Sequence, residues 1–401
     1  MSTLSVLVWL FPFAEVAMML FGLVTARFDT RHKTGSGATQ AIIQITTIGN
    51  HETVNWMIQK IKDYELPFPF EIWLVIEPFV APGFEGMDEV VVVPAEFPAR
   101  AKYKARAQEY SRTVRQARGL SRSDVKIVML DDDVLPTKKY LIDAFNADYD
   151  VCEGITTPRL HYGRFLSHLD DLRTLSCLTI CSAFQGHGHP IWVHGEGLCM
   201  RGSAEQVVTW DYPIVASEDL VFGQNAVERG MTWGFLWEYV QLTSPWTMSD
   251  FIKQRRRWLW GNIYAIRLGL IPPLGTTLLV ARYAFALIVA IVAAVASVLV
   301  PLGIVSIPAK WLAPLLVALG IWIVQFSAAC WIGSSFEERS QTERLRDTII
   351  GTLLAPITSA LGFFVIMICL FKGDPKRFEV IAKTKPARPS AGDDAKELVK
   401  G

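Results

Sequence analysis

Long apolar runs constrain the fold of this chain more than any other feature of its sequence. Residues 4–24 are almost entirely apolar, and residues 283–305, 311–333 and 348–371 form three further runs. At a rise of about 1.5 Å per residue, a helix over any of these runs is long enough to cross a hydrocarbon core of about 30 Å. The sequence therefore predicts membrane helices on both sides of a more polar central block.

Basic residues next to the first run predict how the chain is oriented. Arg27, Arg31 and Lys33 follow this run, whereas a cleaved signal peptide has its basic residues in front of a shorter apolar stretch. Because basic residues favour the cytoplasmic side, we expect residues 1–26 to form a transmembrane helix with a non-cytoplasmic N-terminus. The central block then lies in the cytoplasm, and the chain is a multi-pass integral membrane protein.

The region after the central block leaves two arrangements open. Three spans within residues 276–371 would place the C-terminus outside, but the basic tail, residues 372–401, favours the cytoplasm. A re-entrant hairpin broken at Pro356 would return the tail to the cytoplasmic side. The tail itself has the composition of a disordered segment.

Composition excludes several classes of protein. The chain is 51% hydrophobic and 19% charged, against about 25% charged in an ordinary domain, and its 39 Lys and Arg balance 39 Asp and Glu. We therefore expect neither disorder of the whole chain nor nucleic-acid binding through a basic surface. The six cysteines include no C-x-x-C pair, which argues against a disulfide scaffold and a structural zinc site. Cys177 and Cys181 are expected to be small core residues.

The central block, residues 38–250, has the pattern of an α/β domain. Strand patterns cover Ala41–Thr47, Glu71–Glu77, Glu89–Pro94 and Lys126–Leu130, and helical patterns between them cover Glu52–Tyr64 and Ala101–Ala117. Strands that alternate with helices predict a mostly parallel sheet with helices on both faces. Ligands of such sheets bind beyond the carboxyl ends of the strands, which here are followed by Glu77 and Asp131–Asp133.

The acidic run Asp131, Asp132 and Asp133 is the first candidate site. Three adjacent carboxylates repel one another unless a cation neutralises them. Mg²⁺ and Mn²⁺ prefer oxygen ligands and are often shared between carboxylates and substrate phosphates. A solvated acidic turn after a strand is the alternative interpretation.

The second candidate is Ser217, Glu218 and Asp219, which open an apolar helical pattern. Ser217 fits a helix N-cap, and acids in the first turn are favoured by the helix dipole. A carboxylate at a helix start can also act as a general base. The two interpretations are compatible.

Two basic segments are candidates for phosphate binding. Lys102 and Arg106 lie four residues apart and share one helix face. Gln254–Trp258 places three arginines before a tryptophan, within an expected amphipathic interface helix over residues 251–275. The alternatives are a solvated helix face for the first segment and contact with anionic lipid for the second.

The order of these motifs resembles family 2 glycosyltransferases, in the membrane-bound branch that contains cellulose, hyaluronan and chitin synthases. The matching motifs are the D-x-D of Asp131, Asp132 and Asp133, the E-D pair of Glu218 and Asp219, and the Q-x-x-R-W of Gln254, Arg257 and Trp258. Lys104–Ala107 and Thr243–Thr247 look most similar to the egghead-type β-1,4-mannosyltransferases. The second strand departs from the family, because Ile76-Glu77-Pro78 replaces an aspartate-rich D-D-G or D-D-S, and Glu77 is the best substitute.

The resemblance implies a GT-A nucleotide-sugar fold with flanking transmembrane helices, and inversion at the anomeric carbon. It implies that Asp219 is the general base and that Glu218 orients the site. It also implies that Asp133, with Asp131 nearby, holds Mg²⁺ or Mn²⁺ at the leaving diphosphate.

The resemblance also assigns residues to the two substrates. Gly195, Glu196 and Gly197 stand where the family carries an acceptor-contacting loop, and Trp258 offers a flat ring on which a sugar can stack. The expected donor-binding residues are Thr47, Glu77, Lys104, Arg106, Asp131, Asp132, Asp133, Gln254, Arg257 and Trp258.

The expected activity is transfer of a hexose from a GDP- or UDP-sugar to a glycan or glycolipid acceptor at the lipid bilayer. By resemblance, GDP-mannose with a β-1,4 linkage comes first and UDP-glucose next. A processive polysaccharide synthase and a polyprenyl-phosphate sugar transferase are the enzymatic alternatives. A non-enzymatic transporter or lipid-binding scaffold would leave the acidic strand ends unexplained, and the oligomeric state is left open.

Overall fold

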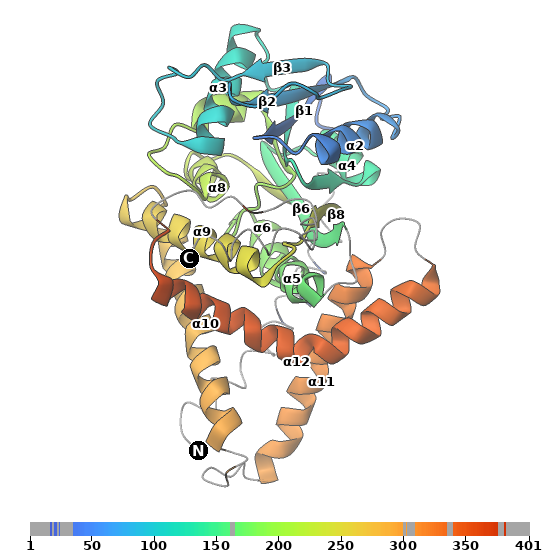
Figure 1. Cartoon of the computed structure of the whole chain (residues 1–401), viewed down its shortest axis with the longest axis vertical. Helices are drawn as coiled ribbons and strands as arrows, with labels where there is room; N and C mark the ends of the chain where they lie inside the picture. The colour runs from blue at the N-terminus through green and yellow to red at the C-terminus, as the bar shows by residue number, and fades with distance from the viewer. Residues whose placement is uncertain are drawn as a thin grey trace, which may run out of the picture.

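In the computed structural model, the described residues are 35–160, 165–299, 309–334 and 340–375, with Ala17, Leu20, Phe21, Val24, Leu302 and Ile381. An α/β domain lies above a group of long helices (Figure 1). The expected N-terminal helix, residues 1–26, and the expected tail, residues 372–401, lie almost wholly outside the described residues.

The α/β domain is built on an eight-stranded sheet of described strands. They are β1 (Gln40–Thr47), β2 (Phe70–Ile76), β3 (Glu89–Val92), β4 (Val125–Asp131), β5 (Val134–Pro136), β6 (Val151–Leu160), β7 (Leu198–Arg201) and β8 (Trp233–Thr243). Their order across the sheet is β3-β2-β1-β4-β7-β6-β8-β5. The neighbours β3, β2, β1 and β4 are all parallel, whereas β7 is antiparallel to both β4 and β6, and β5 is antiparallel to β8.

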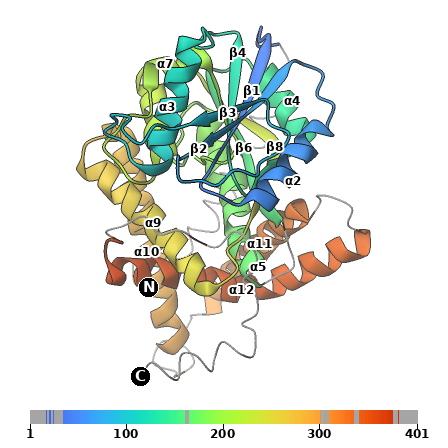
Figure 2. The ribbon, with the colours of Figure 1, turned by 45° about the horizontal axis from the view of Figure 1, so that its top comes forward.

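The helices complete the domain and the region below it. They are α2 (His51–Lys62), α3 (Tyr103–Ala117), α4 (Lys138–Asn146), α5 (Phe165–Ser176), the π-helical turn η2 (Cys177–Cys181), α6 (Ser182–Gln185), α7 (Gly202–Val208), α8 (Glu218–Glu228), α9 (Met248–Arg267), α10 (Pro273–Leu299), α11 (Ala309–Gly333) and α12 (Gln341–Lys372). Figure 2 shows α2 and α4 on one side of the sheet and α3 and α7 on the other.

Both faces of the sheet are buried because successive side chains of a strand point in opposite directions. In β1, Ile43 and Ile45 join the core that contains α2 and α4. The intervening Ile42 packs instead with Trp73 and with Ala107 of α3. This two-sided burial explains why β1, β2 and β4 read as nearly continuous apolar runs, as expected of central parallel strands.

The α/β prediction is confirmed, but the sheet is mixed. The four predicted strands and the two predicted helices match β1, β2, β3, β4, α2 and α3 to within a few residues. Strands β5 to β8 were not predicted. One reason is that β6 carries the buried, polar Glu153, which breaks its apolar pattern, while β5 and β7 are only three and four residues long.

The long helices below the sheet are connected to it through α5 and α9. Leu169 of α5, Phe251 of α9 and Val365 of α12 belong to one buried cluster. Helix α12 crosses beneath the domain, in front of the descending α10 and α11 (Figure 1). The domain and the long helices therefore share a packed interface.

The predicted membrane spans are not confirmed. Among the described helices, none alone is both long enough and apolar enough to cross a membrane, but the segments Gln341–Thr358 and Ala360–Lys372 pass that test together. These two parts of α12 meet at a bend of 45°. Pro356 lies just before the bend, where it removes one backbone hydrogen bond and crowds the preceding turn. At Pro356 the chain thus bends and continues, and it does not reverse as a tight hairpin.

Candidate active site

The carboxyl ends of three neighbouring strands meet at one edge of the sheet. In the strand register, Thr46 lies opposite Asp131 and Thr47 lies opposite Ile76, which precedes Glu77. The hydroxyl of Thr47 donates a hydrogen bond of 2.8 Å to Oδ2 of Asp132. The structure thus brings together the strand-end residues that the sequence singled out, as parallel pairing requires.

Lys104 is the cation at the centre of this edge. It lies in the first turn of α3, where its Nζ contacts Oδ1 of Asp131 and lies 3.4 Å from Oε1 of Glu218. Burial lowers the pKa of this ammonium, but the charges of Asp131, Glu218 and Asp219 outweigh burial and raise the pKa above its ordinary value. Lys104 is therefore charged at any physiological pH.

Asp219 stands in the first turn of α8, next to this cation. Burial first, and then the charge of Glu218, raise the pKa of Asp219 to about 7, although Lys104 acts in the opposite direction. A carboxyl with this pKa is poised to accept a proton near neutral pH. Its backbone neighbour Leu220 donates a hydrogen bond of 2.8 Å to Oδ1.

The predicted acceptor loop reaches the same two side chains. A Cβ on Gly195 would lie 3.0 Å from Nζ of Lys104 and 3.1 Å from Oδ2 of Asp219. Gly197 has a φ of +80°, and a Cβ there would lie 2.6 Å from Val240. Both positions therefore require glycine, the first because of a close approach and the second because of backbone conformation as well.

The start of α8 differs in one detail from the expected cap. Ser217 is the N-cap residue, but its φ of 65° is left-handed and its side chain makes no capping hydrogen bond. The reason is packing, because Gly261 of α9 lies against Ser217, and a Cβ there would come within 2.5 Å of its Oγ. Helix α9 thus supports the turn that carries Glu218 and Asp219.

The acceptor side of the site contains a chain of charges and rings. Glu196 accepts a hydrogen bond of 2.9 Å from Nη2 of Arg173 in α5. Burial alone would raise the pKa of Glu196, but Arg173 and His194 outweigh it and lower the pKa to about 2. The guanidinium carbons of Arg173 and Arg255 lie 4.8 and 4.3 Å from the centroid of the Trp258 ring, within cation–π range.

Sequence reasoning missed Arg173 and also Asp170, which pairs with Arg255; it placed Arg255 only in a candidate phosphate- or lipid-binding segment. Asp170 and Arg173 sit in the short, apparently ordinary helix α5, about 85 positions before Arg255 in the chain. A charged pair inside an otherwise buried helix was the one available signal. The shared contact of Arg173 and Arg255 with Trp258 exists only in the folded chain.

Gln254 of the Q-x-x-R-W motif is buried, and Arg257 and Trp258 are partly buried on the same helix. Gln254 is 5% exposed, and its Oε1 has no hydrogen-bond partner in the part of the chain that the structure describes. Trp258 is covered by the two arginines named above, and Arg257 is partly buried on the same helix. A buried amide oxygen without a partner is costly, so it favours a donor group brought by a substrate.

The interpretation of this segment as a lipid-binding helix does not hold for at least one of its arginines, Arg256. Its Nε donates to the carbonyl of Gly373 at 2.6 Å, and its Nη2 donates to the carbonyls of Lys372 and Asp374. These carbonyls end α12, where backbone acceptors lack helical partners. Arg256 therefore caps a helix of the same chain.

Glu77 and Arg106, both expected to bind the donor, pair with each other. Nη1 of Arg106 lies 2.8 and 3.1 Å from the two carboxylate oxygens of Glu77. Nη2 of Arg106 also donates to the carbonyl of Ala95 at 3.0 Å and contacts that of Pro94. The pair fixes the loop after β3 and leaves Glu77 at the rim of the site.

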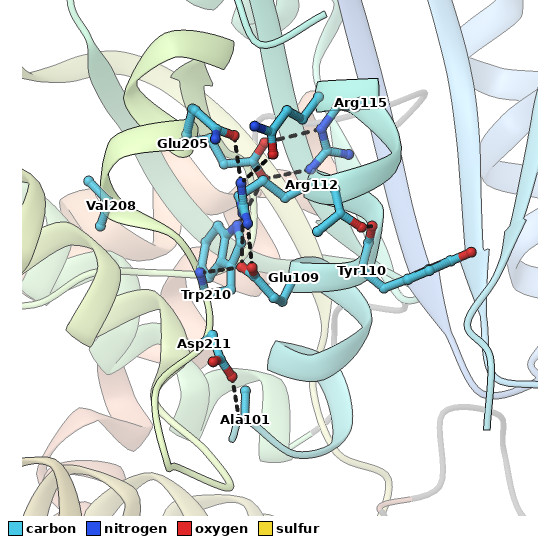
Figure 3. A network of polar contacts seen from close by, with 12 residues as sticks. Ala101, Glu109, Tyr110, Arg112, Arg115, Glu205, Val208, Trp210 and Asp211 are labelled. Atoms are coloured by element: carbon cyan, nitrogen blue, oxygen red, sulfur yellow. Dashed lines mark hydrogen bonds and ion pairs between the residues drawn. The ribbon is translucent and has the colours of Figure 1, made fainter. Parts of the chain in front are cut away.

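The helix that carries Lys104 is fixed by a buried polar network (Figure 3). Arg115 and Glu205 form a fully buried ion pair between α3 and α7. Glu109 pairs with Arg112 one turn away, and the Trp210 indole and backbone N–H groups donate to Glu205 and Glu109 at 2.8 and 2.9 Å. A solvated face was the alternative interpretation of Lys102 and Arg106 on this helix, and the network further along it was not predicted, because buried pairing between distant segments leaves no local pattern.

The carboxylates at the sheet edge suit a hard divalent cation. Asp132 and Asp133 are buried beside the partly buried Asp131, although the oxygens of the three carboxylates do not all lie within 4.8 Å of one another. Carboxylate oxygens are the ligands that Mg²⁺ and Mn²⁺ prefer. The residues therefore fit the predicted ion, with the Lys104 ammonium as the cation now in contact with Asp131.

Comparison with known proteins shows which family the segment that carries these residues matches. Residues 126–325, which begin in β4 and run through α9 into α11, match the model of glycosyl transferase family group 2. The chain contains a family 2 glycosyltransferase domain. This assignment covers Asp131–Asp133, the Glu218–Asp219 pair and the Q-x-x-R-W segment.

Curated relatives of this glycosyltransferase domain include two β-1,4-mannosyltransferases. The egh enzyme of Drosophila melanogaster is 30% identical over 194 residues, which are 45% of this chain and 42% of that protein. The bre-3 enzyme of Caenorhabditis elegans is 26% identical over 196 residues, which are 44% and 41% of the two chains. The matched region is thus less than half the length of either relative.

Solved structures show more distant likeness. The match to a mycobacterial protein has a TM-score of 0.36 at 12% identity, and it covers 60% of this chain and 78% of that protein. The match to residues 1–349 of Staphylococcus aureus TarS, solved in complex with UDP, has a TM-score of 0.34 at 11% identity. It covers 88% of this chain and 97% of the TarS chain. These scores are too low to carry an argument, so the fold assignment depends on the strand order and the family match.

Proposed function

We propose that this protein is an inverting membrane glycosyltransferase that moves a hexose from a nucleotide sugar to a glycan or lipid-linked acceptor. The family match over residues 126–325 supports the reaction class. The two mannosyltransferase relatives support GDP-mannose as donor and a β-1,4 linkage as product. The donor and the linkage are thus proposed on relatives that this chain matches over part of its length.

The observation that carries the proposal is the setting of Asp219. Its pKa of about 7 suits a general base, and it lies beside Gly195 of the predicted acceptor loop, where an added Cβ would come within 3.1 Å of its Oδ2. In the proposed step, the acceptor oxygen forms a bond to the anomeric carbon as the bond from that carbon to the phosphate oxygen breaks. The electron pair leaves with the nucleoside diphosphate, and the acceptor proton passes to Asp219.

Positive charge near the leaving group comes from this chain's own residues. Lys104 is held at the sheet edge by Asp131 and Glu218, where it can turn to a diphosphate, and Arg257 would add a charge that does not titrate. Asp131 and Asp133 would hold Mg²⁺ or Mn²⁺. When bound, such an ion stabilises the negative charge that develops on the diphosphate.

The acceptor is proposed to bind between the loop Gly195–Gly197 and Trp258. Glu196 is kept ionised by Arg173, so it can accept hydrogen bonds from sugar hydroxyls at any physiological pH. Trp258 is a partly buried ring next to that ion pair. Glu218 contacts Lys104 and would orient the site.

The chain is further proposed to be an integral membrane protein with its catalytic domain in the cytoplasm. Support comes from the apolar runs of the sequence and from the two parts of α12, which together have the length and composition of a span. An acceptor attached to a lipid would then meet the site from the side of the long helices.

The test is turnover of a panel of nucleotide sugars by the full-length protein in detergent. With Mn²⁺ or Mg²⁺ present, we expect GDP-mannose to be consumed and one mannose to be added in a β-1,4 linkage to a glycan or lipid-linked acceptor. Asp219→Asn should lower kcat by about 10²- to 10⁴-fold, the usual contribution of a general base. Glu228→Gln, an exposed acid at the far end of the same helix, is the matched control and should keep full activity.

Two outcomes would redirect the proposal. Full activity of Asp219→Asn would remove this residue as the base. A ladder of long products from UDP-glucose would identify the processive polysaccharide synthase that the Q-x-x-R-W motif also resembles.

A further inference from the structure

Two cysteines and a histidine meet in the interior, outside the site described above. Cys177 and Cys181 are the first and last residues of η2, and His194 lies in the loop before β7. Their Sγ and nitrogen atoms all lie within 4.8 Å of one another. Among the described residues, no other group of three His, Cys, Asp or Glu gathers in this way.

The spacing of these atoms is that of a tetrahedral metal site. Nε2 of His194 lies 3.5 Å from Sγ of Cys177 and 3.7 Å from Sγ of Cys181. With a Zn–S bond of about 2.3 Å and a Zn–N bond of about 2.0 Å, tetrahedral angles place a sulfur and a nitrogen ligand about 3.5 Å apart. We propose that Cys177, Cys181 and His194 bind one zinc ion, or another thiophilic divalent ion.

The surroundings hold the three ligands in place. All three are buried, at 0%, 1% and 8% exposure in chain order. Glu153 of β6 accepts the backbone N–H of His194 at 2.8 Å and a bond from the side chain of Gln185, which fixes the loop. A π-helical turn positions both cysteines. Such turns are rare in proteins, and those that occur are frequently at functional sites.

Both cysteines are buried core residues, as predicted, and the proposed site would give them a second role that their spacing did not suggest. The absence of a C-x-x-C pair argued against structural zinc, and Cys177 and Cys181 were expected to be plain core residues. The folded chain brings the third ligand from 13 positions beyond Cys181, across the domain core. A ligand set split between a helix turn and a loop has no compact sequence signature.

An ion here would tie η2 to the acceptor loop. His194 directly precedes Gly195, which packs against Lys104 and Asp219, and Glu196 pairs with Arg173 of α5. Because the three ligands are buried and lie outside the residues that contact Asp219, the ion would position this loop and would not take part in the chemical step. The inference is independent of which sugar the enzyme transfers.

The chain supplies its own matched control. Cys152 of β6 and Cys199 of β7 are also buried and lie opposite each other in the strand register. They belong to no group of three ligands in the described part of the chain. A double Cys152→Ser/Cys199→Ser variant therefore removes two buried thiols while leaving the proposed site intact.

The experiment is a Co²⁺ titration of the metal-depleted, full-length protein in detergent, followed by displacement with Zn²⁺. We expect a thiolate-to-cobalt charge-transfer band that saturates at one ion per chain. Cys177→Ser, Cys181→Ser and His194→Gln should each weaken binding by about 100-fold or more, and the control double variant should keep the band. Cobalt bound by the aspartates at the sheet edge gives no sulfur band, so the two sites are distinguished.

A second measurement on the unmodified protein guards against variants that fail to fold. Zn²⁺ should slow alkylation of Cys177 and Cys181 in the native state, read by peptide mass spectrometry, without changing the rate at Cys152 or Cys199. The proposal is overturned if no sulfur band forms, if the control variant loses it equally, or if zinc protects neither cysteine. Isolation of a Cys177–Cys181 disulfide with no bound metal would also overturn it.

Discussion

Asp219 shows how burial and neighbouring groups shift the pKa of one side chain. Burial and the adjacent Glu218 raise its pKa to about 7, while Lys104 holds the pKa down. The balance depends on α8, α3 and the acceptor loop meeting at one point. The local sequence Glu218-Asp219 does not by itself determine this pKa.

The first prediction concerns the pH dependence of catalysis. If Asp219 accepts the acceptor proton, kcat/KM should rise with pH and level off above a pKa of about 7. The measurement is kcat/KM for the donor and acceptor between about pH 5 and pH 9 at constant metal. A profile that stays flat from pH 5.5 upward would assign the proton to another group.

The same pKa predicts a change in stability. The folded pKa of Asp219 lies above the value of about 3.8 for an unfolded aspartate, so the folded state binds more protons between these pH values. Asp219 therefore costs stability as the pH rises from about 4 to about 7. Asp219→Asn should raise the thermal midpoint at about pH 8 and have little effect near pH 4, and Glu228→Gln should change neither value.

Lys104→Met tests the cation at the sheet edge. Without its charge, the pKa of Asp219 should rise further, and the limb of the pH profile should move to higher pH. KM for the nucleotide sugar should rise as well, by about tenfold or more for one lost charge-assisted contact. The control is Lys102→Met, two residues earlier and exposed, which should leave both measurements unchanged.

At the scale of elements, α9 sets the position of the catalytic turn. Gly261→Ala would place a Cβ 2.5 Å from Oγ of Ser217 and about 3.1 Å from Ala216. We expect a loss of about 1–3 kcal/mol in stability and a fall in kcat, because the turn before Asp219 must shift. Gly320→Ala, in a helix position with nothing within 4 Å, is the matched control and should be neutral or slightly stabilising.

A double variant separates crowding from other effects of this change. Ser217→Ala removes the oxygen that the new Cβ meets first, so it should restore part of the activity lost in Gly261→Ala. No recovery in Ser217→Ala/Gly261→Ala would show that Ala216 and its backbone, not Ser217, control the packing.

The buried network of Figure 3 sets the position of α3. Arg115→Met should destabilise the domain by about 3–5 kcal/mol, because it leaves the fully buried carboxylate of Glu205 without its partner. Arg118→Met, at the C-terminal end of the same helix, breaks an exposed pair with Glu89 of β3 and should cost at most about 1 kcal/mol. Thermal midpoints and hydrogen exchange of the α3 amides would measure the difference.

At the scale of the whole molecule, the end of α12 is bound to the catalytic domain. Besides the Arg256 contacts, the Trp260 indole donates to the carbonyl of Cys369 at 3.1 Å, and Tyr264 donates to Asp374 at 2.5 Å. The end of α12 is therefore on the same side of any membrane as α9. With the catalytic domain proposed to be cytoplasmic, the end of α12 at Asp374 would lie on the cytoplasmic side as well.

Labelling in sealed vesicles tests this topology. The six native cysteines are buried, so they should contribute little labelling when a single exposed cysteine is introduced. A membrane-impermeant maleimide should label Lys372→Cys and Lys102→Cys from the same side. Labelling of only one of the two before permeabilisation would place the end of α12 on the opposite side of the membrane from the α/β domain.

Much of this protein could be read from residue order. Apolar strand patterns located β1 to β4, because buried parallel strands must be apolar on both faces. Asp131–Asp133 and Glu218–Asp219 were identified as site residues, since acids that follow buried strands or open helices need a reason to be there. Those patterns are local, and local chemistry is what a sequence displays directly.

The rest arose from contacts between segments that are far apart in the chain. The value of the Asp219 pKa, the Arg173–Trp258–Arg255 stack and the Cys177–Cys181–His194 cluster all depend on distances between separate elements. Burial changes the energy of a charge or a thiol by more than any neighbour in sequence does, and burial is a property of the folded chain. Order along the chain thus revealed which groups are present, and folding set their charge states and their partners.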